Sequence, residues 1–206
     1  KTDFETKDVC LLHGVTSSGK TQLYIQLIED ILPTGKQVLF LVPEIALTMQ
    51  LISRLEKHFG DKLSVMHSKY SVHERIEVWH NVFENQPKAQ IIIGTRMALF
   101  LPFSDLGLIV IDEEHEASYK QINRAPRYHT RDAAVVLAHQ HQAKVLLGSA
   151  SPSFESYHNA KTGKYALVEL TIESDNFLSS SDLKRIHGAH EGIIHIIPVV
   201  SKKQEI

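Results

Sequence analysis

The sequence predicts a doubly wound α/β domain, in which a mainly parallel β-sheet has helices on both faces. Short apolar runs alternate with segments whose apolar residues recur at helical spacing, the pattern of repeated βα units. Some runs are uninterrupted, as in residues 38–42, which is typical of a strand buried on both faces of a parallel sheet. The polar clusters all follow the ends of expected strands. Because parallel strands end at one edge of the sheet, we expect these clusters to form one composite site.

The first βα unit contains a glycine-rich loop. Residues 9–12 predict a buried strand, the loop follows, and a helix continues to about Leu32 with Leu23, Leu27 and Ile31 on one face.

The second unit pairs a buried strand with a helix of clear periodicity. A turn over residues 33–36 leads into the strand at 38–42. We expect the helix to open at Pro43, because proline favours the first helical position, and to stop at Gly60. Its apolar residues at helical spacing are Ile45, Met49, Ile52, Leu55 and Phe59.

Three further strands and one capped helix follow. The expected strands are residues 63–66, 90–94 and 106–111. Ser71 and Glu74 fit a capping box, which predicts a helix that begins there. That helix has Ile76, Trp79 and Phe83 on one side.

The last part of the domain begins with a polar loop rich in Tyr, Arg and Lys, residues 117–129. We expect Thr130 to cap a helix that runs through Ala138, and residues 144–148 to form the sixth strand. Residues 165–170 then predict an edge strand. The expected domain covers residues 1–171. We expect residues 172–206 to be a linker or the start of a second domain, and residues 193–197 to form a strand.

Composition indicates an ordinary globular protein. The 206 residues are 43% hydrophobic and 22% charged, and their formal net charge is −2, so any nucleic-acid binding must come from a local patch. No apolar run approaches the ~18 residues of a membrane span and no signal peptide is visible, so we expect a cytoplasmic protein with no membrane partner. Cys10 is the one cysteine and the 13 histidines are scattered, so we expect no zinc.

The glycine-rich loop fits G-x-x-x-x-G-K-[ST], the phosphate-binding P-loop. Between a strand and a helix N-terminus, its backbone N–H groups and the helix dipole favour an anion. Lys20 would reach the β- and γ-phosphates of ATP, and the Thr21 hydroxyl would hold Mg²⁺. The alternative is a capped glycine turn with Lys20 in solvent. The residues of the motif are Gly14, Val15, Thr16, Ser17, Ser18, Gly19, Lys20 and Thr21.

A second group of polar residues follows the strand at 106–111. Asp112 would hold Mg²⁺ opposite Thr21, and Glu113 would orient and polarise the attacking water. The alternative is an acidic cap on a surface turn. After the sixth strand, the Ser149 and Ser151 hydroxyls could bond towards this acidic cluster and report the γ-phosphate, or could belong to a locally capped turn.

Residues 14–21, 112–115 and 148–152 resemble motifs I, II and III of superfamily two helicases. Further blocks in order make the chain similar, from about residue 9 to residue 170, to the PriA family of replication-restart helicases. Those blocks are residues 41–48, 67–68, 74–75, 94–100, 112–121 and 126–128.

This resemblance implies the first of two RecA-like motor domains in a larger chain. The implied enzyme is an ATP- and Mg²⁺-dependent 3′→5′ DNA helicase that acts on single-stranded and forked DNA with other primosome proteins. The positions that match the ATP site are Lys20, Thr21, Asp112 and Glu113. Those that match segments facing DNA are Pro43, Glu44, Thr95 and Arg96. Those that match the aromatic-rich loop coupling DNA binding to hydrolysis are Tyr119, Lys120, Gln121, Arg127 and Tyr128.

Two other functions fit the nucleotide motif. One is a P-loop kinase-like enzyme or self-contained ATPase acting on a substrate other than nucleic acid. The other is a non-catalytic module that holds DNA or a protein. If the chain is half of a motor, we expect little turnover from it alone, because an arginine finger supplied by a second domain contributes ~10³–10⁵ in rate in other P-loop enzymes.

Overall fold

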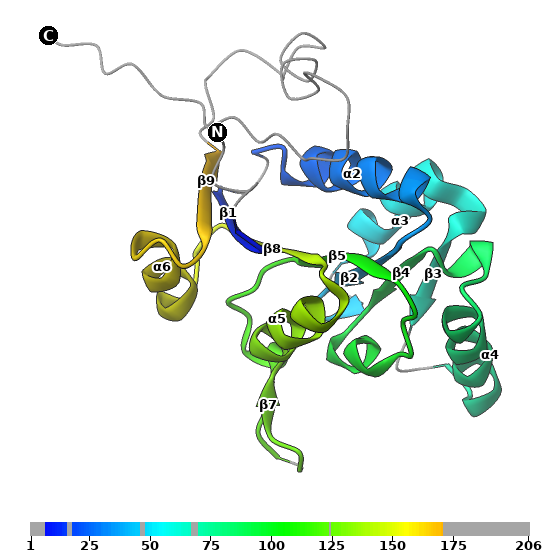
Figure 1. Ribbon diagram of the computed structural model, residues 1–206. Coiled ribbons are helices and arrows are strands. Elements are labelled where there is room, and N and C mark those ends of the chain that lie inside the picture. Colours follow the sequence, from blue (N-terminus) through cyan, green and yellow to red (C-terminus); the bar gives the residue numbers. More distant parts are fainter. Residues whose placement is uncertain (1–6, 16–17, 46–47, 67–69, 124, 171–206) are drawn as a thin grey trace, which may run out of the picture.

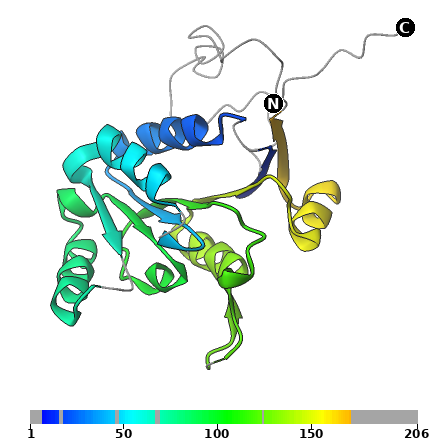
Figure 2. The same cartoon turned by 180° about the vertical axis from the view of Figure 1, so that it is seen from behind.

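The computed structural model describes residues 7–15, 18–45, 48–66, 70–123 and 125–170. Seven parallel strands form one sheet in the order β3-β4-β2-β5-β8-β1-β9, with helices on both faces (Figures 1 and 2). The strands are β1 (Val9–Gly14), β2 (Gln37–Leu41), β3 (Leu63–Met66), β4 (Ile91–Gly94), β5 (Leu106–Ile111), β8 (Lys144–Ser149) and β9 (Ala166–Leu170). The helices are α2 (Lys20–Ile31), α3 (Met49–Phe59), α4 (Val72–Phe83), α5 (Thr130–His141) and α6 (Phe154–Lys161). The doubly wound fold is therefore confirmed, with β9 at one edge.

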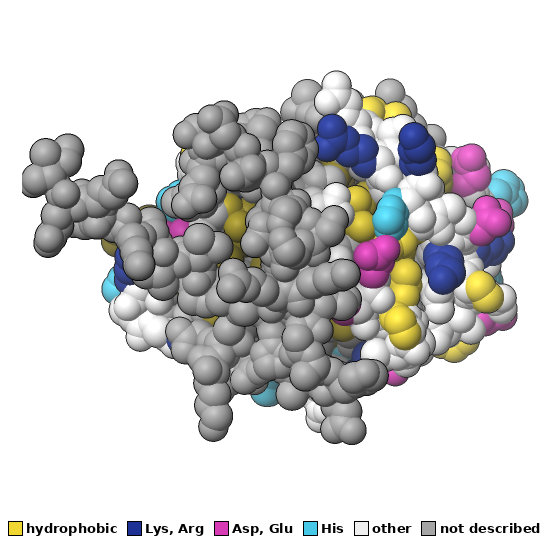
Figure 3. All heavy atoms as spheres, turned by 90° about the horizontal axis from the view of Figure 1, so that it is seen from above, with side chains coloured by type: hydrophobic (Ala, Val, Ile, Leu, Met, Phe, Trp, Pro, Cys, Tyr) yellow, Lys and Arg dark blue, Asp and Glu magenta, His cyan; other side chains and the backbone are white. Residues whose placement is uncertain are grey.

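Each face of the sheet has its own hydrophobic cluster. On one face, α2 and α3 pack side chains such as Ile28 and Leu55 against the strands. On the other, α4, α5 and α6 contribute smaller residues, among them Val82, Ala134 and Ala160. All six residues of β5 are buried because both faces of this central strand are covered. Figure 3 looks onto the α2–α3 side, where charges of both signs lie among hydrophobic side chains. None of the described helices is long and apolar enough to cross a bilayer.

The strand order divides the carboxyl edge of the sheet into two neighbouring regions. Strands β1, β8 and β5 are adjacent, and β2 and β4 lie on the other side of β5. The loops after β1, β8 and β5 are those with the nucleotide motifs. The loops after β2 and β4 hold Pro43, Glu44, Thr95 and Arg96. The loop after β5 therefore lies between the two groups of expected site residues.

The expected start of the second helix is wrong. Helix α3 begins at Met49, and Pro43 lies in the preceding loop. The Pro43 carbonyl accepts a hydrogen bond from the Ser118 hydroxyl, and the Thr48 hydroxyl donates to the Glu44 carbonyl. These bonds hold the backbone after β2 outside a helix. The expected end is confirmed, since Gly60 caps α3 with φ of 54°.

The expected N-cap of α5 is also wrong. His129 is the N-cap, and its Nδ1 accepts a hydrogen bond from Arg131 N. The Thr130 hydroxyl instead donates to the Tyr119 carbonyl at 2.8 Å, because the chain from Tyr119 returns alongside it. The capping box of α4 is confirmed: Ser71 Oγ accepts from Glu74 N at 3.3 Å, and a Glu74 oxygen accepts from Ser71 N at 2.7 Å.

The face of helix α4 that packs on the sheet is not the face with the aromatic side chains. Val78 and Val82 pack on the sheet, whereas Trp79 and Phe83 stack on each other and are 42% and 58% exposed. The expected strand at 193–197 lies outside the described residues, as do His67 and Ser68.

Candidate nucleotide and nucleic-acid site

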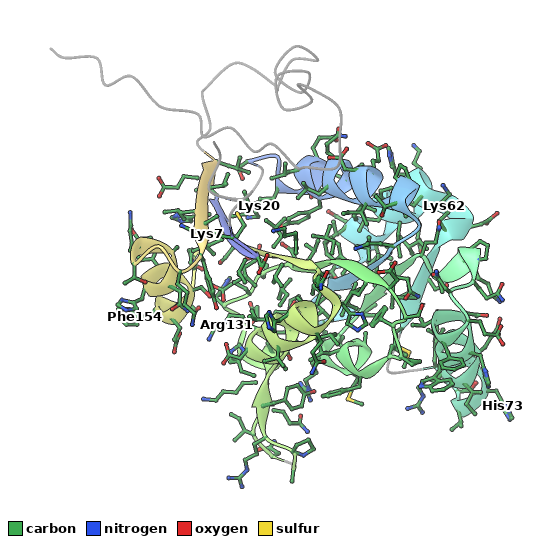
Figure 4. The ribbon with its side chains drawn as sticks, viewed as in Figure 1. Lys7, Lys20, Lys62, His73, Arg131 and Phe154 are labelled. Carbon is green, nitrogen blue, oxygen red and sulfur yellow. The ribbon has the colours of Figure 1, made fainter. Side chains whose placement is uncertain are left out.

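Lys20 is the first residue of α2 and points back towards the end of β1 (Figure 4). Its ammonium donates to the Gly14 carbonyl at 2.7 Å and lies 3.8 Å from Glu113 Oε1. Gly19 adopts φ of 88°, the left-handed conformation in which glycine avoids a Cβ clash, and this turns the loop into the helix. The side chain of Lys20 is only 10% exposed, so its charge is held inside the site. Thr16 and Ser17 lie outside the described residues.

Asp112 follows β5 and is held from three sides. Its Oδ1 accepts a hydrogen bond from the Tyr24 hydroxyl at 2.8 Å, and its N–H donates to the Leu41 carbonyl at 3.0 Å. The Tyr119 hydroxyl donates to the Asp112 carbonyl at 2.7 Å. Burial raises the pKa of the Asp112 carboxyl, and the hydrogen bond from Tyr24 opposes that rise. Burial also raises the pKa of Tyr24 well above its ordinary value, so its hydroxyl is a donor at neutral pH.

Glu113, His115 and the two serines after β8 form a connected group. His115 Nδ1 lies 2.8 Å from Ser149 Oγ and 3.6 Å from Glu113 Oε2, and His115 Nε2 lies 3.3 Å from Ser151 Oγ. The Ser149 and Ser151 hydroxyls therefore contact His115, which lies beside Glu113, and the expectation that they bond towards the acidic cluster stays a prediction. The locally capped turn is present as well, because Ser151 N donates to Ser149 Oγ and Ser153 caps α6.

The residues at the ends of β1 and β5 fit a magnesium-bound nucleotide. Ser18 Oγ is buried and has no hydrogen-bond partner among the described residues, which leaves a polar group inside the P-loop to satisfy. The half-buried Asp112 carboxylate and the hydroxyl of Thr21, the second residue of α2, are oxygen ligands of the kind that Mg²⁺ prefers. Within the described ranges no group of three His, Cys, Asp or Glu side chains could hold a metal. Asp112 with Thr21 is the candidate magnesium site because of the oxygen ligands that the two side chains offer.

The residues expected to face DNA lie along the loops after β2, β4 and β5. Arg96 opens a short 3-10 helix after Thr95, and its Nη1 donates to the Ser118 carbonyl at 2.7 Å. The chain then forms a two-stranded hairpin, β6 (Lys120–Gln121) and β7 (Tyr128–His129), which projects below α5 in Figure 1. Lys120, Arg127 and Glu44 are exposed, whereas Gln121, Pro43 and Thr95 are half-buried.

The two tyrosines of this loop have different environments. Tyr128 is half-buried, with its ring edge-on to Phe100 at 5.2 Å between centroids, and Phe100 is 55% exposed. Tyr119 is 1% exposed, and its hydroxyl donates to the carbonyls of Leu41 and Asp112. Tyr119 has no free ring face on which a base could stack, so in this structure it is a link between the loop and Asp112.

Several residues of the site were not predicted from the sequence. Nothing in the local pattern around Tyr24 indicates that its hydroxyl would reach a strand end 88 residues away. Glu114 is fully buried and lies 3.5 Å from Arg131 Nη1, with the hydroxyls of Ser153 and Ser156 also on its carboxylate. The one available signal was the third acidic residue in the block Asp112-Glu113-Glu114.

Comparison with known proteins agrees with this geometry. The family model for DEAD/DEAH box helicases matches residues 2–160. The chain is 46% identical over 168 residues to the replication restart protein PriA of Bacillus subtilis, covering 82% of this chain and 20% of that protein. It is 49% identical over 169 residues to PriA of Haemophilus influenzae, covering 82% and 23%. The chain thus spans about a fifth of the length of these curated relatives.

Solved structures share the fold. RecG bound to a three-way DNA junction matches with a TM-score of 0.58 at 21% identity, over 83% of this chain and 22% of that one. A DEAD box protein from Methanococcus jannaschii matches with a TM-score of 0.51 at 17% identity, over 83% and 50%. The RecA-like fold expected from the resemblance is therefore confirmed. Since the family model covers well over half of the sequence, this chain belongs to the DEAD/DEAH box helicases.

Proposed function

We propose that the chain is the ATP-binding motor domain of a 3′→5′ DNA helicase of the PriA type, which couples ATP hydrolysis to unwinding at stalled replication forks. The observation that supports this most is the convergence of Lys20, Asp112 and Glu113 at the ends of β1 and β5, next to loops that present Arg, Lys and aromatic side chains. The relatives named PriA support the replication-restart role.

Each residue of the nucleotide site has a role that its position supports. Lys20 binds the β- and γ-phosphates, exchanging the Gly14 carbonyl for phosphate oxygens. Asp112 and Thr21 hold Mg²⁺, which neutralises negative charge on the phosphates when bound. Glu113 orients the attacking water and accepts its proton, and His115 holds the Glu113 carboxylate beside Ser149 and Ser151.

The neighbouring loops support a nucleic-acid surface that does not read sequence. Arg96, Lys120 and Arg127 would contact backbone phosphates, whose binding is electrostatic and salt-dependent. Tyr128 and Phe100 are the aromatic pair on which an unpaired base could stack. Pro43, Glu44 and Gln121 line the same edge. Other primosome proteins are further partners in this proposal.

The nucleotide site is tested by titrating the full-length gene product with a fluorescent ATP analogue and Mg²⁺. We expect Lys20→Ala to weaken binding by about 10- to 150-fold, equivalent to the ~1.5–3 kcal/mol of a hydrogen bond to a charged group. Lys36→Ala is the matched control, because that lysine is exposed and 3.9 Å from Asp105, away from the site. Equal affinities for the two variants would contradict the assignment of Lys20.

The DNA part of the proposal is tested by ATPase and unwinding assays. We expect hydrolysis that depends on single-stranded DNA, and unwinding of a duplex with a 3′ single-stranded tail but not of one with a 5′ tail. Robust hydrolysis without DNA would favour a self-contained ATPase. Transfer of the γ-phosphate to a small acceptor would favour a kinase.

A further inference from the structure

Glu114 and Arg131 are two buried, oppositely charged residues, and none of their side-chain bonds to the described residues is to the glycine-rich loop. Glu114 is 0% exposed, and its carboxylate accepts hydrogen bonds from Ser153 N at 2.7 Å, Ser153 Oγ at 3.0 Å and Ser156 Oγ at 2.8 Å. Arg131 Nη1 lies 3.5 Å from the same carboxylate and donates to Ser153 Oγ at 2.7 Å. A buried carboxylate is costly unless it is paired and hydrogen-bonded, and here the described residues supply both.

The pair joins three elements that are distant in the sequence. Glu114 follows β5, Arg131 is in the first turn of α5, and the serines are at the start of α6. In Figure 4, Arg131 lies between the start of α5 and α6. Arg131 Nε also donates to Asp132 Oδ1 at 2.9 Å, which fixes the plane of the guanidinium. The first turn of α5 is therefore tied to the loop after β5.

Glu113 lies between two anchored neighbours. Asp112 N donates to the Leu41 carbonyl and Glu114 N donates to the Gly148 carbonyl, each at 3.0 Å. These bonds attach the segment to β2 on one side and to β8 on the other. Between them Glu113 adopts φ of 48°, a left-handed conformation that a residue with a side chain keeps only where its surroundings hold it. The buried side chain of Glu114 is the adjacent anchor.

The same turn of α5 continues directly from the hairpin proposed to contact DNA. Strand β7 ends at His129, and α5 begins at Thr130, whose hydroxyl donates to the Tyr119 carbonyl at 2.8 Å. The Tyr119 hydroxyl in turn donates to the Asp112 carbonyl. The hairpin is therefore connected to Arg131 through the chain, and to Asp112 through the hydrogen bonds of Thr130 and Tyr119.

We propose that Glu114 and Arg131 are positioning residues: the buried pair holds Glu113 in its left-handed conformation, so that the Glu113 carboxylate is kept in place for its role in hydrolysis. This inference rests on the proposed function. Among the described residues the Glu114 side chain bonds to Arg131 and the start of α6 and not to Lys20, so we expect the pair to affect kcat and to leave nucleotide affinity unchanged.

The test measures DNA-stimulated ATP hydrolysis by the full-length gene product, with kcat and KM for ATP determined separately. We expect Glu114→Gln and Arg131→Gln each to lower the DNA-stimulated kcat by about 10- to 100-fold, the effect of a small displacement of a reacting group. KM for ATP and binding of a fluorescent ATP analogue are expected to stay at the wild-type value. Glu77→Gln is the matched control, because Glu77 pairs with Lys88 in solvent, and it is expected to change nothing.

The double variant Glu114→Gln/Arg131→Gln separates positioning from stability. Arg131→Gln leaves the buried Glu114 carboxylate without its cation, and Glu114→Gln leaves Arg131 with Asp132 and Glu155 but without its buried partner, so each single variant lowers Tm. The double variant removes both buried charges. We expect the double variant to regain Tm but not DNA-stimulated kcat. Recovery of kcat together with Tm would show a structural role only and overturn the proposal. Single variants with wild-type kcat would also overturn it. A wild-type protein without DNA-stimulated hydrolysis would instead refute the proposed function.

Discussion

Gly148 lies in β8 and faces the side chains of Tyr24 and Asp112. Its replacement by alanine therefore tests the geometry of the site. A Cβ there would overlap the Tyr24 hydroxyl oxygen and lie 3.0 Å from Cζ of the same ring. Tyr24 is 1% exposed and packs edge-on against Phe40, so the ring cannot move without repacking the core. Overpacking costs about 1–3 kcal/mol, and loss of the hydrogen bond to Asp112 about 1.5–3 kcal/mol. We therefore expect Gly148→Ala to lower the free energy of unfolding by about 2.5–6 kcal/mol.

The assay is urea denaturation, with two further variants as controls. Gly35→Ala has open space around its Cβ but a φ of 77°, so it should cost only about 1 kcal/mol, the strain of the backbone conformation. Tyr24→Phe removes the hydroxyl that the new methyl group would strike, so the double variant should cost less than the two single variants together. If Gly148→Ala costs no more than Gly35→Ala, or if the two effects simply add, the clash with Tyr24 is not the cause.

Three further predictions concern stability and reactivity. Burial raises the pKa of the Asp112 carboxyl in the folded state. The stability that the protonated carboxyl contributes is fully present below the ordinary carboxyl pKa and is lost as pH rises through the raised pKa. A pH series of denaturation curves should show this fall in the free energy of unfolding, and the fall should be smaller in Asp112→Asn. Ser71→Ala removes the capping box of α4 and should cost about 1 kcal/mol in the same assay, whereas Ser53→Ala on the exposed side of α3 should cost nothing and slightly stabilise the helix, because alanine has the higher helix propensity. Burial raises the pKa of the Cys10 thiol to about 12, so alkylation by iodoacetamide at pH 8 should require unfolding, and rapid labelling of the folded chain would contradict the burial of β1.

Local patterns predicted the elements whose signals are complete within a few residues. The capping box at Ser71 and Glu74 is one example, because both of its hydrogen bonds join residues three apart. Strand β5 is another, since an apolar run of six residues fits a strand buried on both faces. The P-loop and the Asp112-Glu113 pair belong to this class as well. Each lies directly after a strand, and parallel strands bring such positions to one edge.

Predictions failed where a distant partner competes for a backbone or side-chain group. Pro43 is a good first residue for a helix, but its carbonyl accepts a bond from Ser118, and α3 starts later. Thr130 is a good N-cap, but its hydroxyl bonds to the carbonyl of Tyr119. In both cases a hydrogen bond to a residue outside the helix replaces the local one.

The sequence by itself determined the order of the strands and helices of the main sheet and placed the glycine-rich loop and the acidic residues Asp112 and Glu113 after strands, because periodicity and motif spacing are properties of short segments. Only the tertiary structure decided that Tyr24 contacts Asp112 and that Glu114 pairs with Arg131. Those contacts join residues 88 and 17 positions apart, and they depend on which strands are neighbours in the sheet and on how α5 and α6 pack against it. No local pattern encodes that packing, since it minimises the free energy of the whole domain.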